Sequence, residues 1–232
     1  MIKRLFFHIR TKKHGQSFVE LMLIVLILAL MLSGVVEFGF LLNSYLKVLD
    51  GAREGARFSN AGDAFAREVL PPFDYIYDGD GLHISNQNFY IFTTIETLRV
   101  MSPITLNGNL GDDIVISVFS VAGGSILRWP AGYVDGWNLC DHSGDAAFVG
   151  DLIAANWSSC TARPSHFTSA QVLARMDASA PPSGVLLVEV YYNYPQILKL
   201  PVFAQVIPDP MPVYTYSMMP LLSAEPTPTP IP

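Results

Sequence analysis

The sequence predicts an α+β protein in which a long N-terminal transmembrane helix extends outside the membrane and packs on a small antiparallel sheet. An apolar run fills most of residues 18–42, and no proline occurs before Pro71. Segments rich in β-branched residues with partial alternation come later, at 114–120, 185–194 and 213–219. A chain of 232 residues has room for one membrane helix and one globular domain.

The chain divides into five parts. They are a basic leader at 1–15, a transmembrane helix at 16–42, an extracytoplasmic extension of that helix at 43–60, an extracytoplasmic α+β domain at 61–222 with an insertion at about 130–184, and a Pro/Thr-rich tail at 223–232. Because proline is absent, we expect residues 18–60 to form one continuous rod. The tail lacks the hydrogen-bonding capacity for helix or sheet, so it is expected to be extended.

Two carboxylates border the apolar run. Between Glu20 and Glu37 only apolar residues, Ser33 and Gly34 occur. Seventeen helical steps separate the two carboxylates by about 25 Å, close to a hydrocarbon core of about 30 Å. We therefore expect Glu20 and Glu37 to mark the two faces of the membrane. A carboxylate at this depth is costly, which indicates that Glu20 has a function.

Charge is distributed unevenly along the chain. The first fifteen residues hold five lysines and arginines and no acid, whereas the whole chain has a net charge of −6. Basic residues favour the cytoplasmic side, so the pattern predicts a single-pass protein of the cytoplasmic (inner) membrane with its N-terminus in the cytoplasm and its C-terminal domain outside. The acidic remainder argues against nucleic acid as a partner.

Three motifs carry a resemblance to a known family. They are Gly15-Gln16-Ser17-Phe18-Val19-Glu20, Val36-Glu37-Phe38-Gly39 and Ala52-Arg53-Glu54-Gly55-Ala56-Arg57. Together they resemble the TadE-like pseudopilins of tight-adherence (Flp pilus) systems, although Leu21 stands where the family usually has an aromatic residue. The resemblance implies a pilin-like fold and a minor pilin that a prepilin peptidase cuts. The implied partners are other pilins and pseudopilins, pilus-assembly membrane proteins, the peptidase and the lipid bilayer.

The spacing of Gly15, Gln16 and Glu20 predicts a processing site. Cleavage after Gly15 would create an α-amine on Gln16 at the depth of Glu20, and Glu20 of one copy would neutralise the N-terminus of its neighbour. The alternative is an ordinary signal peptide, which also has a basic segment before an apolar one. The apolar run is longer than a usual signal sequence, and no small-x-small cleavage site follows it before Asn43.

Small and charged residues share the outer part of the helix. Gly51, Ala52, Gly55 and Ala56 form a face that lets another backbone approach closely, belonging either to this chain's own domain or to neighbouring helices. Charged side chains alternate with them at three- and four-residue separations and are interpreted as a solvated face that carries part of the family resemblance. They are Asp50, Arg53, Glu54 and Arg57. Glu37 joins Glu20 as a predicted assembly residue.

The outer domain shows several local signals. Residues 114–120 and 126–129 flank Gly123-Gly124 and predict a hairpin. Helices are expected at 63–70, 88–101, 148–155 and 168–177, and a turn at 78–81. The prolines around 213–219 predict an edge strand. Three or four antiparallel strands follow from these patterns.

Two cysteines, Cys140 and Cys160, fall in the outer part. In an oxidising compartment they are expected to form one disulfide, worth about 3 kcal/mol in the chain-entropy model. In a reducing exterior they would be buried free thiols.

Catalytic and metal sites are not predicted. Ser, His and Asp occur together at Asp141-His142-Ser143, but no nucleophile elbow surrounds any serine. Four acids near Cys140 are too loosely spaced for a calcium loop, and three histidines are too dispersed for zinc. These residues are Asp135, Asp141, Asp145 and Asp151, with His83, His142 and His166. No phosphate-binding loop occurs, so we expect no enzyme and no cofactor.

The function predicted from the sequence is that of a membrane-anchored pseudopilin, or minor pilin, acting in assembly of a tight-adherence type pilus or secretion apparatus. The alternative is a permanently anchored extracytoplasmic surface or binding protein that is not incorporated in a pilus. An anchored hydrolase would need a convergent polar pocket that the sequence does not indicate.

Overall fold

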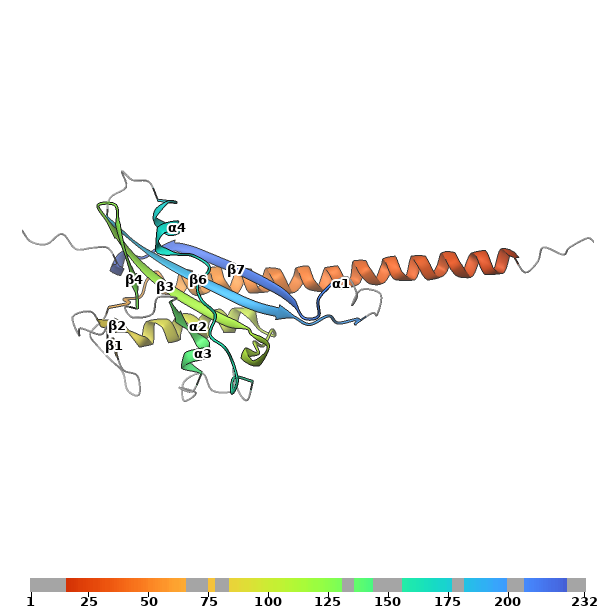
Figure 1. Cartoon of the computed structure of the whole chain (residues 1–232), viewed down its shortest axis with the longest axis horizontal. Coiled ribbons are helices and arrows are strands. Elements are labelled where there is room, and N and C mark those ends of the chain that lie inside the picture. Colours follow the sequence, from red (N-terminus) through yellow and green to blue (C-terminus); the bar gives the residue numbers. More distant parts are fainter. Residues whose placement is uncertain are drawn as a thin grey trace, which may run out of the picture.

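The computed structural model describes residues 16–65, 75–77, 84–130, 136–143, 156–176, 182–199 and 207–224. One long helix extends from a domain made of a twisted sheet and short helices (Figure 1). The leader with Gly15, the turn predicted at 78–81, the helix predicted at 148–155 and the tail beyond 224 lie outside the described residues.

Helix α1 spans Gln16–Ser59, which confirms the predicted continuous rod. Most of its large apolar side chains from Phe18 to Leu46 are exposed, and full burial begins at Val48. The helical continuation predicted at 63–70 is wrong for its first residues, because 63–65 follow α1 without helical structure. Helix α1 ends at Ser59, and the Asp63 carboxylate accepts a hydrogen bond from the backbone N–H of Phe65 at 2.8 Å, which favours a local turn.

The main sheet has five antiparallel strands in the order β4-β3-β6-β7, with β5 also paired to β3. The strands are β3 (Asp113–Ala122), β4 (Ser125–Trp129), β5 (Trp137–Asn138), β6 (Ser183–Tyr194) and β7 (Met211–Pro220). The predicted hairpin is confirmed: Gly123 and Gly124 connect β3 to β4 with φ of 55° and 78°, which suit glycine. Strand β7 lies at an edge, as its prolines predicted.

A second, two-stranded sheet pairs β1 (Tyr75–Tyr77) with β2 (Ile84–Asn86). Helix α2 (Gln87–Met101) follows at once and confirms the helix predicted at 88–101. The short helices are α3 (Leu139–His142) and α4 (Ser169–Leu173), with 3-10 turns at η1 (Gly108–Leu110) and η3 (Leu222–Ala224). Thr168 and Gln171 form a capping box that starts α4, a shorter helix than the one predicted at 168–177.

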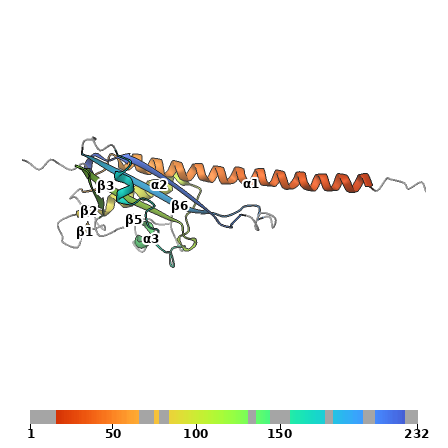
Figure 2. The same cartoon turned by 45° about the horizontal axis from the view of Figure 1, so that its top comes forward.

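Two apolar clusters lie on opposite faces of the sheet. Alternate residues of β6, including Leu186, Val188 and Val190, belong to the larger core, which also contains residues of α1 and α2. Leu187 faces the other way and packs with Phe119 and with Phe167 next to α4. The period-two pattern of β6 therefore separates its two faces as the sequence predicted. Figure 2 shows α1 and the sheet running side by side over the outer half of the helix.

Candidate functional site: the N-terminal helix and the segments that contact it

The N-terminal end of α1 is a free apolar rod. Its backbone is helical from Gln16, and Glu20 is exposed on it one turn later. Apart from Leu30, the large side chains from Phe18 to Met31 are at least half exposed. Among the described residues no side chain forms a hydrogen bond or ion pair with Glu20. One helix of the described chain is long and apolar enough to cross a membrane, and that helix fits a single-pass anchor.

In the described part of the chain Glu37 has three hydrogen-bond partners, one at the last residue of β6 and two in the loop that follows. Its carboxylate accepts hydrogen bonds from Tyr194 Oη at 2.9 Å, from Ile197 N at 2.9 Å and from Leu198 N at 2.8 Å. Hydrogen bonds to a charged acceptor are stronger than those between neutral groups. Glu37 therefore fastens the end of the β6–β7 hairpin to α1, in contacts within one chain. Its predicted role in assembly stays a prediction.

An apolar hollow of about 270 Å³ lies beside this connection. Gly34, Phe38 and Leu41 of α1 form one wall, and Ile207 and Met211 contribute to the other. Since Gly34 lacks a side chain, the helix leaves open space at this level.

The small-residue face of α1 packs against α2 of the same chain. A Cβ placed on Gly51 would lie 2.4 Å from Met101 Cγ and 3.0 Å from the carbonyl oxygen of Thr97. A Cβ on Gly55 would lie 2.0 Å from Thr97 Oγ1. Ala52 and Ala56 are fully buried nearby. Two uses were predicted for this face: packing against the chain's own domain and packing against neighbouring helices. The structure shows the first of them.

Threonines line the facing side of α2. Thr93, Thr94 and Thr97 are fully buried, and each hydroxyl donates to a backbone carbonyl four residues earlier in α2. The Thr93 hydroxyl also lies within hydrogen-bond distance of the Ser59 hydroxyl at the end of α1. These bonds satisfy the hydroxyls inside the helix pair, so the two backbones approach without buried unpaired oxygens at this contact.

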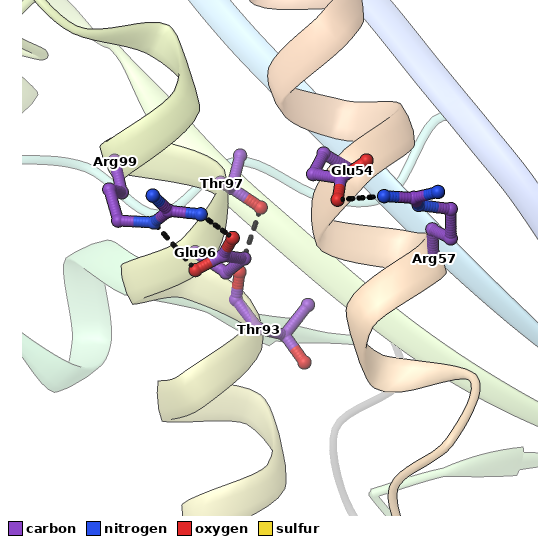
Figure 3. A network of polar contacts seen from close by, with 6 residues as sticks. All are labelled: Glu54, Arg57, Thr93, Glu96, Thr97 and Arg99. Atoms are coloured by element: carbon purple, nitrogen blue, oxygen red, sulfur yellow. Dashed lines mark hydrogen bonds and ion pairs between the residues drawn. The ribbon is translucent and has the colours of Figure 1, made fainter.

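The charged residues of the family motif lie on the solvent side. Arg57 donates to Glu54 at 2.6 Å, and Arg53 lies 4.0 Å from Asp50. On α2 a similar pair joins Arg99 to Glu96, and Figure 3 shows the two pairs on neighbouring helices. Such exposed pairs contribute little to stability, because solvent and salt screen them. The sequence interpretation of a solvated face is consistent with these positions.

The predicted cysteine pair is joined in the structure. Cys140 and Cys160 have their sulfurs 2.04 Å apart. Asp113 lies between the same two segments: its carboxylate accepts from Cys140 N at 3.1 Å and from Arg163 N at 2.9 Å. Burial raises the pKa of Asp113 to about 7, although these backbone N–H groups, with that of Ile114, act in the opposite direction.

Sequence reasoning missed Asp113 and a second buried acid, Glu189. Glu189 is fully buried on the face of β6 away from α1. It accepts from His166 N at 2.8 Å, from Tyr214 Oη at 2.7 Å and from the Ser165 hydroxyl. Alternation in β6 indicated which face Glu189 occupies, but its partners are more than twenty residues away in the chain and no local signal identifies them.

The residues considered for catalysis or metal binding have local partners. The Asp141 carboxylate accepts from the side-chain amide of Asn138, and the Asp141 backbone N–H donates to the Asn138 side-chain oxygen at the start of α3. His142 bonds the Asn138 carbonyl, and the Ser143 hydroxyl donates to the Cys140 carbonyl. Asp135, Asp145, Asp151 and His83 lie outside the described residues. In the part of the chain that the structure describes, no three His, Cys, Asp or Glu side chains gather as metal ligands.

Comparison with known proteins identifies the N-terminal segment. Residues 15–57 match the family model of the TadE-like protein, which covers nearly all of α1 and the glycine before it. No curated protein and no solved structure matches the chain. The N-terminal helix is therefore TadE-like, and this match includes Gly15, Glu20, Glu37 and the motif at 52–57.

Proposed function

From this TadE-like helix we propose that the protein is a membrane-anchored pseudopilin, or minor pilin, that acts in assembly of a tight-adherence type pilus or secretion apparatus. The family match suggests involvement in tight-adherence pilus assembly. In the proposal a prepilin peptidase removes the leader after Gly15, the helix anchors the product in the cytoplasmic membrane, and the outer domain contacts other pilins, pseudopilins and assembly proteins. The protein performs no catalysis and needs no cofactor.

The observation that carries the proposal is that residues 16–57 of the matched segment form one uninterrupted helix, and that Glu20 near its start has no partner in the part of the chain that the structure describes. The exposed apolar surface of that helix needs either lipid or other helices around it. Glu20 has no partner among the described residues, so a partner from outside the chain is free to approach it.

Cleavage would supply that partner. Hydrolysis of the peptide bond after Gly15 leaves a carboxylate on the leader and an α-amine on Gln16. The amine is then a cation at the membrane edge, about one helical turn from Glu20. In an assembled filament the amine of one subunit and Glu20 of the next would relieve each other's desolvation cost, whereas a monomer leaves both near water or headgroups.

Two variants separate processing from assembly. Gly15→Leu should accumulate uncut precursor, because a peptidase cleft that fits a residue without a Cβ excludes a larger one. Glu20→Ala should be cut normally yet co-purify poorly with pilus components. Gly39→Ala is the control, since a Cβ at Gly39 meets nothing within 4 Å. Cutting in Gly15→Leu, or full assembly of Glu20→Ala, would contradict the proposal and favour a permanently anchored surface protein.

A further inference from the structure

We propose that the loop after β6 is a second membrane contact, in which Ile197 and Leu198 insert into the outer leaflet beside α1. The inference rests on the proposed membrane anchor and concerns a different part of the chain. It begins with Glu37, because this residue fixes the height of the loop along the helix.

The loop is held at the outer end of the apolar span. Glu37 lies seventeen helical steps after Glu20, so the two are separated by roughly 25 Å along the axis, close to the thickness of a hydrocarbon core. The backbone N–H groups of Ile197 and Leu198 donate directly to the Glu37 carboxylate. Both residues therefore lie at the level where lipid headgroups meet acyl chains. In Figures 1 and 2 the C-terminal end of β6 points along α1 toward its N-terminal half.

The side chains at this position are unusual for a water-exposed loop. Ile197 is 54% exposed and Leu198 is 38% exposed. Lys199, which follows, is exposed as well. Two aliphatic side chains followed by a lysine suit the membrane interface, since the aliphatic groups enter the acyl region and the ammonium reaches lipid phosphates. The apolar hollow between Phe38 and Met211 adjoins the same level and continues the apolar surface from α1 to the loop.

Three backbone N–H groups of the loop have hydrogen-bond acceptors within the protein, which favours a position in a nonpolar environment. Irregular backbone at membrane depth is tolerated only where its polar groups have partners. The Glu37 carboxylate provides the acceptor for two of them. Gln196, which is buried, fixes the base of the loop: its N–H donates to Asp209 at 3.0 Å, and its side-chain amide donates to the carbonyls of Ile207 and Pro208 at 3.2 and 3.3 Å. The loop thus presents Ile197 and Leu198 from a fixed base.

A bilayer is the occupant that these observations favour over a second copy of the chain. Phe38 of α1 is exposed and directly follows Glu37, which binds the loop that carries the exposed Ile197 and Leu198. At this level α1 is already surrounded by lipid in the proposed anchor. A protein partner would need to cover the loop while leaving the helix beside it in lipid.

Depth-dependent quenching in the full-length protein tests the proposal. Single cysteines replace Leu198, Val25 or Leu127, each variant carries an environment-sensitive fluorophore, and the protein is reconstituted in phosphatidylcholine vesicles with or without brominated acyl chains. Leu127 is the matched control, an exposed leucine (58%) of β4, which lies at the opposite end of the domain from the apolar rod. Ile197 is a second labelling position if the Leu198 variant fails to fold.

We expect brominated lipid to cause a loss of fluorescence at positions 198 and 25 and none at 127. Quenching at 25 without quenching at 198 would overturn the loop contact and leave the membrane anchor intact. Absence of quenching at 25 would overturn the anchor itself. A label at 198 that is shielded from aqueous iodide but insensitive to brominated lipid would show that protein covers the loop, and quenching at 127 would show unspecific adsorption; either result contradicts the proposal.

Discussion

Glu37 is the residue at which the end of the span and the outer domain meet. Its carboxylate accepts one side-chain and two backbone hydrogen bonds from residues about 160 positions later in the chain. The desolvation free energy of a carboxylate at the edge of a membrane is smallest where several hydrogen-bond donors surround it. The contacts of Glu37 therefore lower this desolvation cost, and they also position the loop.

Replacing Glu37 should release the loop. Hydrogen bonds to a charged group contribute about 1.5–3 kcal/mol each, so Glu37→Ala is expected to raise the hydrogen-exchange rates of the Ile197 and Leu198 amides by at least about tenfold. Glu20→Ala is the control and should leave both amides unchanged, because Glu20 contacts neither. Equal protection of the two amides in Glu37→Ala and wild type would contradict the contact.

Asp113 predicts a pH dependence of stability. Burial raises its pKa from 3.8 to about 7. Because the folded state binds the proton more tightly than the unfolded state, this contribution to stability is complete below the unfolded pKa and is lost as pH rises through the folded pKa. The free energy of unfolding should fall between pH 4 and 7, with a slope of at most about 1.4 kcal/mol per pH unit from this group.

The comparison with Asp113→Asn isolates that slope. The variant lacks the titrating group, so thermal unfolding of the full-length protein in detergent should show less loss of stability from pH 4 to 7 than wild type shows. A wild-type protein that gains stability over this range relative to Asp113→Asn would mean that the three N–H donors outweigh burial.

At the scale of elements, the contact between α1 and α2 explains the small residues of the family motif. Ala52 and Ala56 are fully buried, and neither Gly51 nor Gly55 has space for a side chain. The motif therefore has a structural role within one chain, independent of any role in a filament.

Added methyl groups should disrupt this contact. Gly55→Ala places a Cβ about where Thr97 Oγ1 lies, and overpacking of this kind costs about 1–3 kcal/mol. Gly51→Ala meets Met101, a flexible side chain, and should cost less. Gly39→Ala is the matched control on the same helix. Thermal unfolding should show the largest loss of stability in Gly55→Ala, a smaller loss in Gly51→Ala and the smallest in Gly39→Ala. No destabilisation in Gly55→Ala would refute the close packing.

The periodicity of the sequence predicted the long helices and strands, but it did not predict the short ones. Residues 16–59 and 185–194 carry sustained periodic or apolar signals, so α1 and β6 were predicted within a few residues. Strand β5 and helix α3 occupy six consecutive residues, 137–142, too few for a period to emerge. Their conformations depend on pairing of Trp137 with β3 and on Asp113 bonding Cys140, which are tertiary contacts.

The candidate site was predicted only in part for the same reason. Gly15, Glu20 and the small residues at 51–56 lie in one contiguous segment where spacing carries information. Tyr194 at the end of β6 and the loop residues Ile197 and Leu198 bind Glu37 from about 160 positions later in the chain, and nothing in their local sequence identifies that partner. The sequence predicted that Glu37 lies at the membrane edge, but it did not predict that a loop of the outer domain binds it.

At the scale of the whole molecule, the arrangement predicts an orientation. A basic leader and an acidic remainder favour an N-terminus in the cytoplasm. A cysteine replacing Asn43 should react with an impermeant thiol reagent added outside the cells, and a cysteine replacing Lys12 in unprocessed protein should not. The reverse pattern would overturn the orientation and, with it, the position of the outer domain.

The central claim is that the leader is removed and the helix retained. Intact-mass analysis of protein extracted from the membrane of cells with active prepilin peptidase tests it most directly. The account predicts a dominant species that begins at Gln16 and still contains the whole of α1. A dominant species that begins at Met1, or one cut after the apolar run, would contradict it.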